Sequence, residues 1–466
     1  AVTANGKGGN GIAVTWGRNH TVNIANGASV KALGDGGVAL RFDFGHNDIG
    51  DDVPSTEVVG SYIYYKNYRH TDYDKIFPAS KLLTSLDGPL VKECNINGAI
   101  EGSAAAIYIS KNPLVKEINI NEGASIKGNI ISEWNPKGMW FSESNPVFLE
   151  NRLPANEDGL TNININQTMS FSDNIIGSES LVLNVANGKN FSSGQDSISP
   201  YALRTVSTAS TDSSPIVDVY RINVNTGATY NNSANLSVRD TTAPSSSTDG
   251  AITIDGGHFN NSGNLIVGNG QGTISVTNNG TFTQSEAGSL TTTIDGSGNS
   301  TKIALANNGT ASLNGTLNIV PQKDFYGSQQ TINLLADGST GSYSMNNNLN
   351  INILPTEGMT ITHTVDGNGN IIINRERHFD TYGQSAAQKA LGQILNDNLD
   401  YLGNLPEHGA DWQKLFTELD AADGAGKASA LKQMNPSIMH SSAQANLNTH
   451  SMLNNLNMLG SFSNNI

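Results

Sequence analysis

Short runs of alternating apolar and polar residues recur along most of the chain and are interrupted by Gly, Asn or Asp. In Gly272–Tyr343, for example, Ile274 and Val276 alternate with Thr and Ser, and Leu317 and Ile319 repeat the pattern. A period of two over so few residues is typical of half-buried strands. The Asn-Gly and Asp-Gly breaks favour tight turns, because both residue types reach positive φ at low cost. The pattern therefore predicts many short strands joined by turns.

The strand-and-turn unit also repeats over longer distances. Asn26–Lys31 reads Asn-Gly-Ala-Ser-Val-Lys, and Asn121–Lys127 reads Asn-Glu-Gly-Ala-Ser-Ile-Lys. Echoes of this kind suit a solenoid with coils of roughly 20–30 residues and loops inserted into some of them. A single short strand pair cannot bury its inward face, whereas stacked coils give every strand a neighbour on both sides. We therefore expect an all-β solenoid of stacked parallel strands.

The apolar period changes near residue 379. Ala387, Leu391 and Leu395 are spaced by four residues, which predicts an amphipathic helix. Further helical patterns cover residues 412–419, 428–434 and 437–459. The predicted organisation is a β rod with inserted loops over 1–271, terminal coils over 272–378 and an all-α segment over 379–466.

Composition and charge narrow the function classes. The chain has 466 residues, of which 49 are Gly, 14% are charged and 6% are aromatic, and this favours a long repetitive β structure over compact domains with surface helices. The net charge of −15 disfavours binding to nucleic acid. A single cysteine, Cys94, excludes an internal disulfide and is compatible with secretion. We interpret the chain, which begins within the strand pattern and shows no signal peptide, as a mature or excised sequence.

Catalytic motifs are absent from the sequence. There is no Gly-x-Ser-x-Gly, no His-Glu-x-x-His and no Gly-x-x-x-x-Gly-Lys-Ser/Thr. His70, Asp72 and Asp74 could form an acid–base group, but no nucleophile motif accompanies them. A polysaccharide-cleaving β-helix enzyme would need carboxylates clustered in one groove, and none falls in register. We therefore predict neither catalysis nor a cofactor in this chain.

Three acidic segments invite a metal-binding interpretation. His46, Asp48, Asp51 and Asp52 could hold a hard cation, although a solvated acidic loop explains them better. Asp366–Asn370 imitates the first half of a calcium loop, but Ile371 stands where the loop needs Gly and Arg377 where it needs Glu. A hairpin turn between 361–365 and 371–374 fits better, and Asp295–Ser300 is interpreted in the same way. We predict no metal site.

Aromatic residues gather in one short stretch. Tyr62, Tyr64, Tyr65 and Tyr68 are candidates for binding a partner, because exposed aromatics often dominate interfaces. Tyr62, Tyr64 and Tyr68 also share one parity, so a strand could direct them inward as core residues instead.

Residues near the change of period carry a family resemblance. Ala311–Ile319 reads Ala-Ser-Leu-Asn-Gly-Thr-Leu-Asn-Ile, and Thr331–Ala336 with Gly341–Tyr343 reads Thr-Ile-Asn-Leu-Leu-Ala … Gly-Ser-Tyr. These segments resemble the end of a bacterial type V autotransporter passenger, with Tyr343 where the family often has Phe. Ala430–Pro436 and Gln384–Leu391 are similar to the helices that precede its translocator barrel, although Met434 and Asn435 replace the usual Leu and Ser.

The N-terminal third resembles the non-catalytic region of subtilisin-like serine protease autotransporters. The phrases that carry this second, looser resemblance are Gly37–Gly45, Gly60–Ile63, Ala105–Asn112 and Gly123–Trp134. It leaves an alternative open, in which the chain is the stem of such a protease and the catalytic domain lies upstream of Ala1.

The resemblance implies a fold, a location and partners. The fold would be a right-handed parallel β-helix, and the terminal coils would act as an autochaperone. The chain would be a monomeric rod at the bacterial cell surface or outer membrane, or secreted. Its partners would be its own C-terminal translocator β-barrel and a host-cell or matrix ligand. Processing between Asn454 and Asn455 would match some family members, with Asn464-Asn465 as a second candidate; an Asn-rich helix face is the alternative. The leading hypothesis is a non-catalytic stem with a structural and adhesive role.

Overall fold

The computed structural model describes residues 1–15, 18–43, 89–110, 113–134, 159–194, 214–240 and 251–434, and the backbone of two strands at 56–59 and 62–65. The chain divides into two compact units. Unit 1 comprises Ala1–Leu290, Ile303–Thr316 and Leu335–Leu349, and unit 2 comprises Thr291–Lys302, Leu317–Leu334 and Asn350–Ile466.

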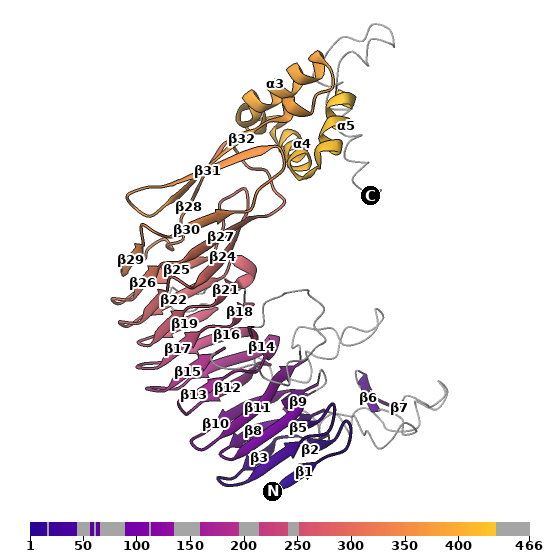
Figure 1. Cartoon of the computed structure of the whole chain (residues 1–466), viewed down its shortest axis with the longest axis vertical. Coiled ribbons are helices and arrows are strands. Elements are labelled where there is room, and N and C mark those ends of the chain that lie inside the picture. The colour runs from indigo at the N-terminus through magenta and orange to yellow at the C-terminus, as the bar shows by residue number, and fades with distance from the viewer. Residues whose placement is uncertain are drawn as a thin grey trace. The chain divides into compact units, whose positions relative to one another are not determined.

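Unit 1 is a parallel β-helix in which short strands of successive coils lie side by side (Figure 1). Its elements are β1 (Val2–Ala4), β2 (Asn10–Val14), β3 (His20–Ile24), β4 (Ser29–Ala32), β5 (Val38–Phe42), β8 (Val91–Ile96), β9 (Ala99–Ile109), β10 (Val115–Ile120), β11 (Ser125–Ser132), β12 (Thr161–Ile165), β13 (Met169–Phe171), β14 (Ile175–Val185), β15 (Asn190–Ser193), β16 (Ile216–Val224), β17 (Thr229–Asn232), β18 (Asn235–Val238), β19 (Ile252–Asp255), β20 (His258–Asn261), β21 (Asn264–Val267), η1 (Gly268–Gly270), β22 (Thr273–Thr277), β23 (Thr281–Gln284), β24 (Ser289–Ile294, continuing into unit 2), β25 (Lys302–Leu305), β26 (Thr310–Leu313) and β29 (Ser342–Met345). A separate antiparallel pair is β6 (Thr56–Val59) with β7 (Tyr62–Tyr65).

The core of unit 1 consists of columns of equivalent residues. One column is at most 3% exposed and contains Ile24, Ile96, Ile120, Ile165, Val185, Val224, Ile254 and Val276. Paired residues such as Asn95 and Asn119 are 24 positions apart, which confirms the predicted coil length, and Asn119 and Asn164 are 45 apart where a segment is inserted. The alternation in the sequence therefore produces the predicted solenoid, because each inward residue packs on its counterpart in the next coil.

Side-chain ladders join the coils on other faces. An outer column of amides links Asn23, Asn95, Asn119, Asn164, Asn184 and Asn223 through hydrogen bonds of 2.7–3.0 Å. The seven-stranded sheet from β13 to β29 carries an inward aromatic column of Phe191, Tyr230, Phe259 and Phe282, with ring centroids 4.9–5.7 Å apart. Such ladders fix the register, because a slip of one residue would move every side chain to the opposite face.

Unit 2 combines strands with three helices, at the positions expected from Ala387–Leu395, 412–419 and 428–434. Its elements are β27 (Thr316–Pro321, beginning in unit 1), β28 (Gln329–Ile332), β30 (Asn350–Ile353), β31 (Met359–Val365), β32 (Ile371–Arg377), η2 (Phe379–Tyr382), α3 (Ala386–Gly403), α4 (Gly409–Ala421) and α5 (Gly424–Met434). β28, β32 and β31 form an antiparallel sheet. Ser385 and Gln388 close a capping box that fixes the start of α3. The fourth predicted helix, at 437–459, lies outside the described residues.

One of the two turns predicted as hairpins is confirmed by the strand pairing, and the other is wrong. Asp366–Asn370 connects β31 to its antiparallel neighbour β32, and the Asp366 amide donates to the Asn370 carbonyl at 3.0 Å, so this hairpin is confirmed. The hairpin at Asp295–Ser300 is wrong. Asp295 does close a turn, but β24 pairs with β27 and β25 pairs with β22, so the chain passes to another face of the coil.

Candidate functional site: the arginine joint of unit 2

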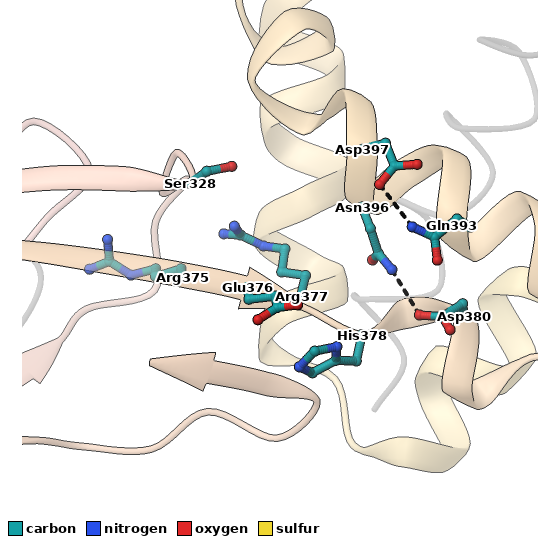
Figure 2. A pocket seen from close by; sticks show the side chains of 9 residues that line it. All are labelled: Ser328, Arg375, Glu376, Arg377, His378, Asp380, Gln393, Asn396 and Asp397. Atoms are coloured by element: carbon teal, nitrogen blue, oxygen red, sulfur yellow. Dashed lines mark hydrogen bonds between the residues drawn. The ribbon is translucent and has the colours of Figure 1, made fainter. Parts of the chain in front are cut away.

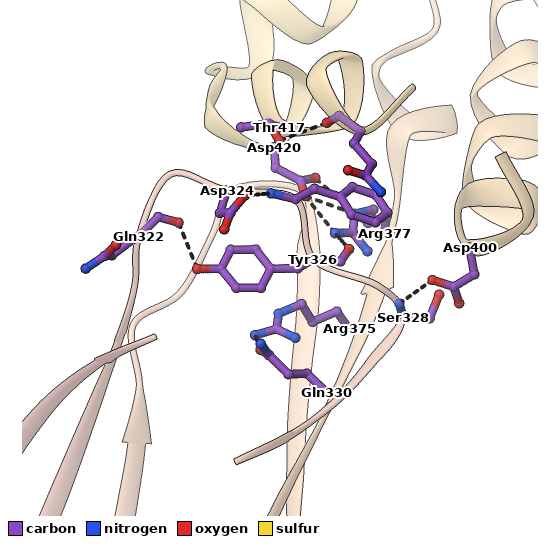
Figure 3. Close-up of polar contacts among 12 residues, drawn as sticks. Gln322, Asp324, Tyr326, Ser328, Gln330, Arg375, Arg377, Asp400, Thr417 and Asp420 are labelled. Atoms are coloured by element: carbon purple, nitrogen blue, oxygen red, sulfur yellow. Dashed lines mark hydrogen bonds and ion pairs between the residues drawn. The ribbon is translucent and has the colours of Figure 1, made fainter. Parts of the chain in front are cut away.

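Two arginines lie on the inward face of β32. Ile371 and Ile373 are fully buried at the start of this strand, and the alternation continues with Arg375 and Arg377, which are 4% and 5% exposed. We call the group formed by Tyr326, Gln330, Arg375, Arg377 and Asp420 the arginine joint (Figure 3). It connects β32 to the loop before β28 and to α4.

Arg377 is paired with a carboxylate and a main-chain carbonyl. Its Nε donates to both carboxylate oxygens of Asp420, at 3.0 and 3.1 Å, and its Nη2 donates to one of them at 2.7 Å. The same Nη2 donates to the Tyr326 carbonyl at 2.7 Å. The side chains of Arg377 and Asp420 are 2% and 11% exposed, so the pair is shielded from water. This forked contact fixes the end of β32 against α4.

Arg375 has a different environment. Its Nη2 donates to Gln330 Oε1 at 2.9 Å, and its guanidinium carbon lies 4.4 Å from the centre of the Tyr326 ring. Its Nη1 is buried and has no hydrogen-bond partner among the described residues. Burial lowers the pKa of Arg375 to about 10. The ring face and one amide therefore compensate the buried charge in place of a carboxylate.

The loop before β28 is anchored to the helices. Phe325 packs against Phe416 with the rings tilted by 41° and their centroids 6.1 Å apart, in a core that also contains Trp412. The Ser328 amide donates to Asp400 Oδ1 at 2.8 Å. The Tyr326 hydroxyl reaches the Ile294 carbonyl at 2.7 Å. Sheet and helices in unit 2 are thus joined by both apolar and polar contacts.

A polar pocket of about 300 Å³ lies beside the joint (Figure 2). Its walls include Ser328, Glu376, His378, Asp380 and Asp397. Several of its polar groups already bind neighbours in the protein: Asn396 Nδ2 donates to Asp380 at 2.8 Å, and His378 Nε2 lies 2.8 Å from the Thr360 hydroxyl. Across the described residues we find no group of three or more His, Cys, Asp or Glu arranged for a metal ion. These hydrogen bonds indicate that the residues around the pocket support α3 and β32 structurally.

The residues singled out from the sequence fall elsewhere. Tyr62, Tyr64 and Tyr65 belong to β7, of which the backbone alone is described, and Tyr68 lies outside the described residues. The candidate processing pairs Asn454-Asn455 and Asn464-Asn465 also lie outside, as do the His46–Asp52 and His70–Asp74 groups. These predictions remain predictions.

The arginine joint is not among the residues singled out from the sequence, although a signal for it was present. Ile371, Ile373, Arg375 and Arg377 share one parity, so continuing the alternation would have placed both arginines on the buried face. Their partner Asp420 lies 43 positions from Arg377 along the chain, and no local pattern connects the two.

Comparisons with known proteins give no further identification: no protein-family model, no curated protein and no solved structure matches the chain. None of the described helices has the length and apolar character required to cross a membrane.

Proposed function

We propose that this chain is the non-catalytic stem of a bacterial type V autotransporter passenger, with a structural and adhesive role at the cell surface or after release. The observation that carries the proposal is the parallel register of unit 1, in which the same inward and outward columns continue from coil to coil. A stem of this kind extends by repetition and needs no catalytic centre.

The register also supports self-templated folding. The strand edge of a finished coil presents backbone donors and acceptors, together with one half of each ladder, to the coil that docks next. We assign residues 272–378 as the segment that folds first. The arginine joint, which anchors the end of this segment at Arg377 to α4, favours its early stability.

The proposed function implies two binding partners and a location at the cell surface. The partner within the precursor is a C-terminal translocator β-barrel that follows the helical segment, and the external partner is a host-cell or matrix ligand. No nucleic acid is involved, because the net charge of −15 would repel phosphates.

Surface display tests this proposal. The chain is placed between a secretion signal and a type V translocator barrel and produced in a Gram-negative host. We expect intact cells to bind an antibody against the chain and to lose that signal on external protease treatment. A matched fusion carrying Ile118→Asp, which puts a charge into a fully buried column, controls for dependence on coil folding. A wild-type chain that remains in the periplasm would refute the proposed function.

A further inference from the structure

The turn after β26 has an unusual internal contact. Gly315 donates its backbone N–H to the side-chain Oδ1 of the preceding residue, Asn314, at 2.8 Å. Gly315 has φ +72°, and a Cβ at this position would lie 2.3 Å from the Gly288 carbonyl oxygen. Glycine is therefore required here, and its nitrogen is held against the carboxamide of its own neighbour.

Four other Asn-Gly pairs in the chain hold the glycine nitrogen differently. The sequence contains ten such pairs. In four of them the glycine N–H donates to a backbone carbonyl elsewhere: Gly188 to Thr226, Gly280 to Thr277, Gly309 to Ala306, and Gly369 to Asp366, at 2.8–3.1 Å. Those bonds direct the nitrogen away from the preceding side chain. The Asn314–Gly315 contact does the opposite, since the carboxamide carbon is only one C=O bond, about 1.23 Å, from the oxygen that accepts the hydrogen bond.

We propose that Asn314 is a site of spontaneous succinimide formation, and hence of conversion to aspartyl and isoaspartyl residues. The Gly315 nitrogen loses its proton to solvent base and attacks Cγ of Asn314. The N–Cγ bond forms, the Cγ–Nδ2 bond breaks, and the side-chain nitrogen takes up a proton and leaves as ammonia. Water then opens either C–N bond of the imide ring. No oxidant or reductant is required.

The surroundings of Asn314 permit both steps. The residue is half-buried, so water reaches it. Its Nδ2 has no hydrogen-bond partner within the described part of the chain, so no contact retains the leaving group.

The modification would affect a buried contact. Gln284 is 1% exposed, and its Nε2 donates to the Thr316 carbonyl at 3.1 Å and to the Asn314 carbonyl. In an isoaspartyl residue at 314 the main chain runs through Cβ and Cγ to Gly315, and the carbonyl that accepted from Gln284 becomes part of a free carboxylate outside the main chain. Both acceptors cannot then keep their positions, and the Gln284 amide loses at least one partner.

Mass spectrometry of the ageing protein tests the proposal. The full chain is incubated at mildly alkaline pH, both native and unfolded in urea, and peptides are scored for the one-dalton gain and for methylation by an isoaspartyl methyltransferase. At each site, the rate of asparagine conversion in native protein is divided by the rate in unfolded protein. This ratio removes the effect of the local sequence on the rate. We expect folding to slow conversion of Asn279 and Asn308 at least several-fold more than conversion of Asn314.

Two comparisons make the outcome decisive. Native protein enriched in the isoaspartyl form should melt at a lower temperature than fresh protein, whereas Asn314→Gln, which closes the larger ring slowly, should keep its melting temperature during the same incubation. If folding protects Asn314 as strongly as Asn279 and Asn308, the proposal is overturned. This result would leave the proposed stem function untouched, because the modification chemistry is independent of it.

Discussion

At the scale of single residues, Arg375 and Arg377 occupy equivalent inward positions on β32 but differ in their partners. Arg377 faces a carboxylate, and Arg375 faces an aromatic ring and an amide. A buried charge is tolerated when it is paired and hydrogen-bonded, and removing one member of a pair leaves the other uncompensated. The two arginines therefore form a matched test of the joint.

Replacing Arg377 should destabilise unit 2 more than the same replacement at Arg375. Arg377→Met leaves the Asp420 carboxylate buried without its cation, which we expect to cost about 3–5 kcal/mol. Arg375→Met loses one hydrogen bond from a charged donor, worth about 1.5–3 kcal/mol, but also removes a desolvated charge, which offsets part of that loss. The measurement is the free energy of unfolding from urea titration at neutral pH. Equal losses for the two variants would contradict the assigned roles.

Glu101 gives a pH-dependent contribution to the stability of unit 1. Hydrogen bonds from Lys127 and Lys31, at 2.9 and 3.0 Å, lower the pKa of Glu101 from its usual 4.5. A carboxylate with a lowered folded-state pKa stabilises above the unfolded value, and this stabilisation is lost as the pH falls through the folded-state pKa. Glu101→Gln should therefore be less stable than wild type at neutral pH, and the difference should shrink below pH 4.5. A difference that is constant with pH, measured by urea unfolding, would contradict this account.

At the scale of elements, the outer amide column shows how one strand depends on the next. Asn119 both donates to Asn95 at 2.8 Å and accepts from Asn164 at 2.7 Å, whereas Asn23, at the end of the column, accepts from Asn95 at 3.0 Å. An aspartate can accept in either place, but it cannot donate when ionised.

Asn119→Asp should therefore destabilise more than Asn23→Asp, although both substitutions add the same charge. We expect an excess of about 1–3 kcal/mol for Asn119→Asp, the cost of removing one partner from a part-buried hydrogen bond. The comparison is made by chemical unfolding at one pH above the aspartate pKa. If Asn23→Asp costs as much, added charge and not the lost donor explains the effect.

Cys94 reports on the opening of β8. The thiol is fully buried in a column with Val22 and Ile118, and burial raises its pKa to about 12. Because the thiolate is the reactive species, native protein should react with a thiol reagent at neutral pH much more slowly than urea-unfolded protein. Equal rates would show that Cys94 is accessible in the native state.

Much of the fold follows from local sequence, and the rest depends on distant partners. Alternation predicted the solenoid, because columns such as Ile96, Ile120 and Ile165 need only inward parity to be repeated. Turn chemistry located the bends at Asp295 and Asp366 but not the pairing of the strands beside them, which made one hairpin prediction wrong. The arginine joint was missed for the same reason, since Asp420 is a distant partner of Arg377.

At the scale of the whole molecule, we propose that the coils assemble directionally. A coil is stabilised by the columns and ladders that it shares with its neighbours, so isolated coils are unstable and growth proceeds from a stable segment. We assign that segment to residues 272–378, which include the strands from β22 to β32, and the helices that bind Arg377 and Phe325 support it.

The order in which amides become protected during refolding tests this claim most directly. The full chain is diluted from urea, pulsed with deuterium at increasing times, and analysed by peptide mass. We expect peptides of β22–β32 to gain protection before those of β8–β12, and we expect Arg377→Met to delay protection of both sets. Earlier protection of β8–β12, or simultaneous protection of all coils, would contradict directional assembly.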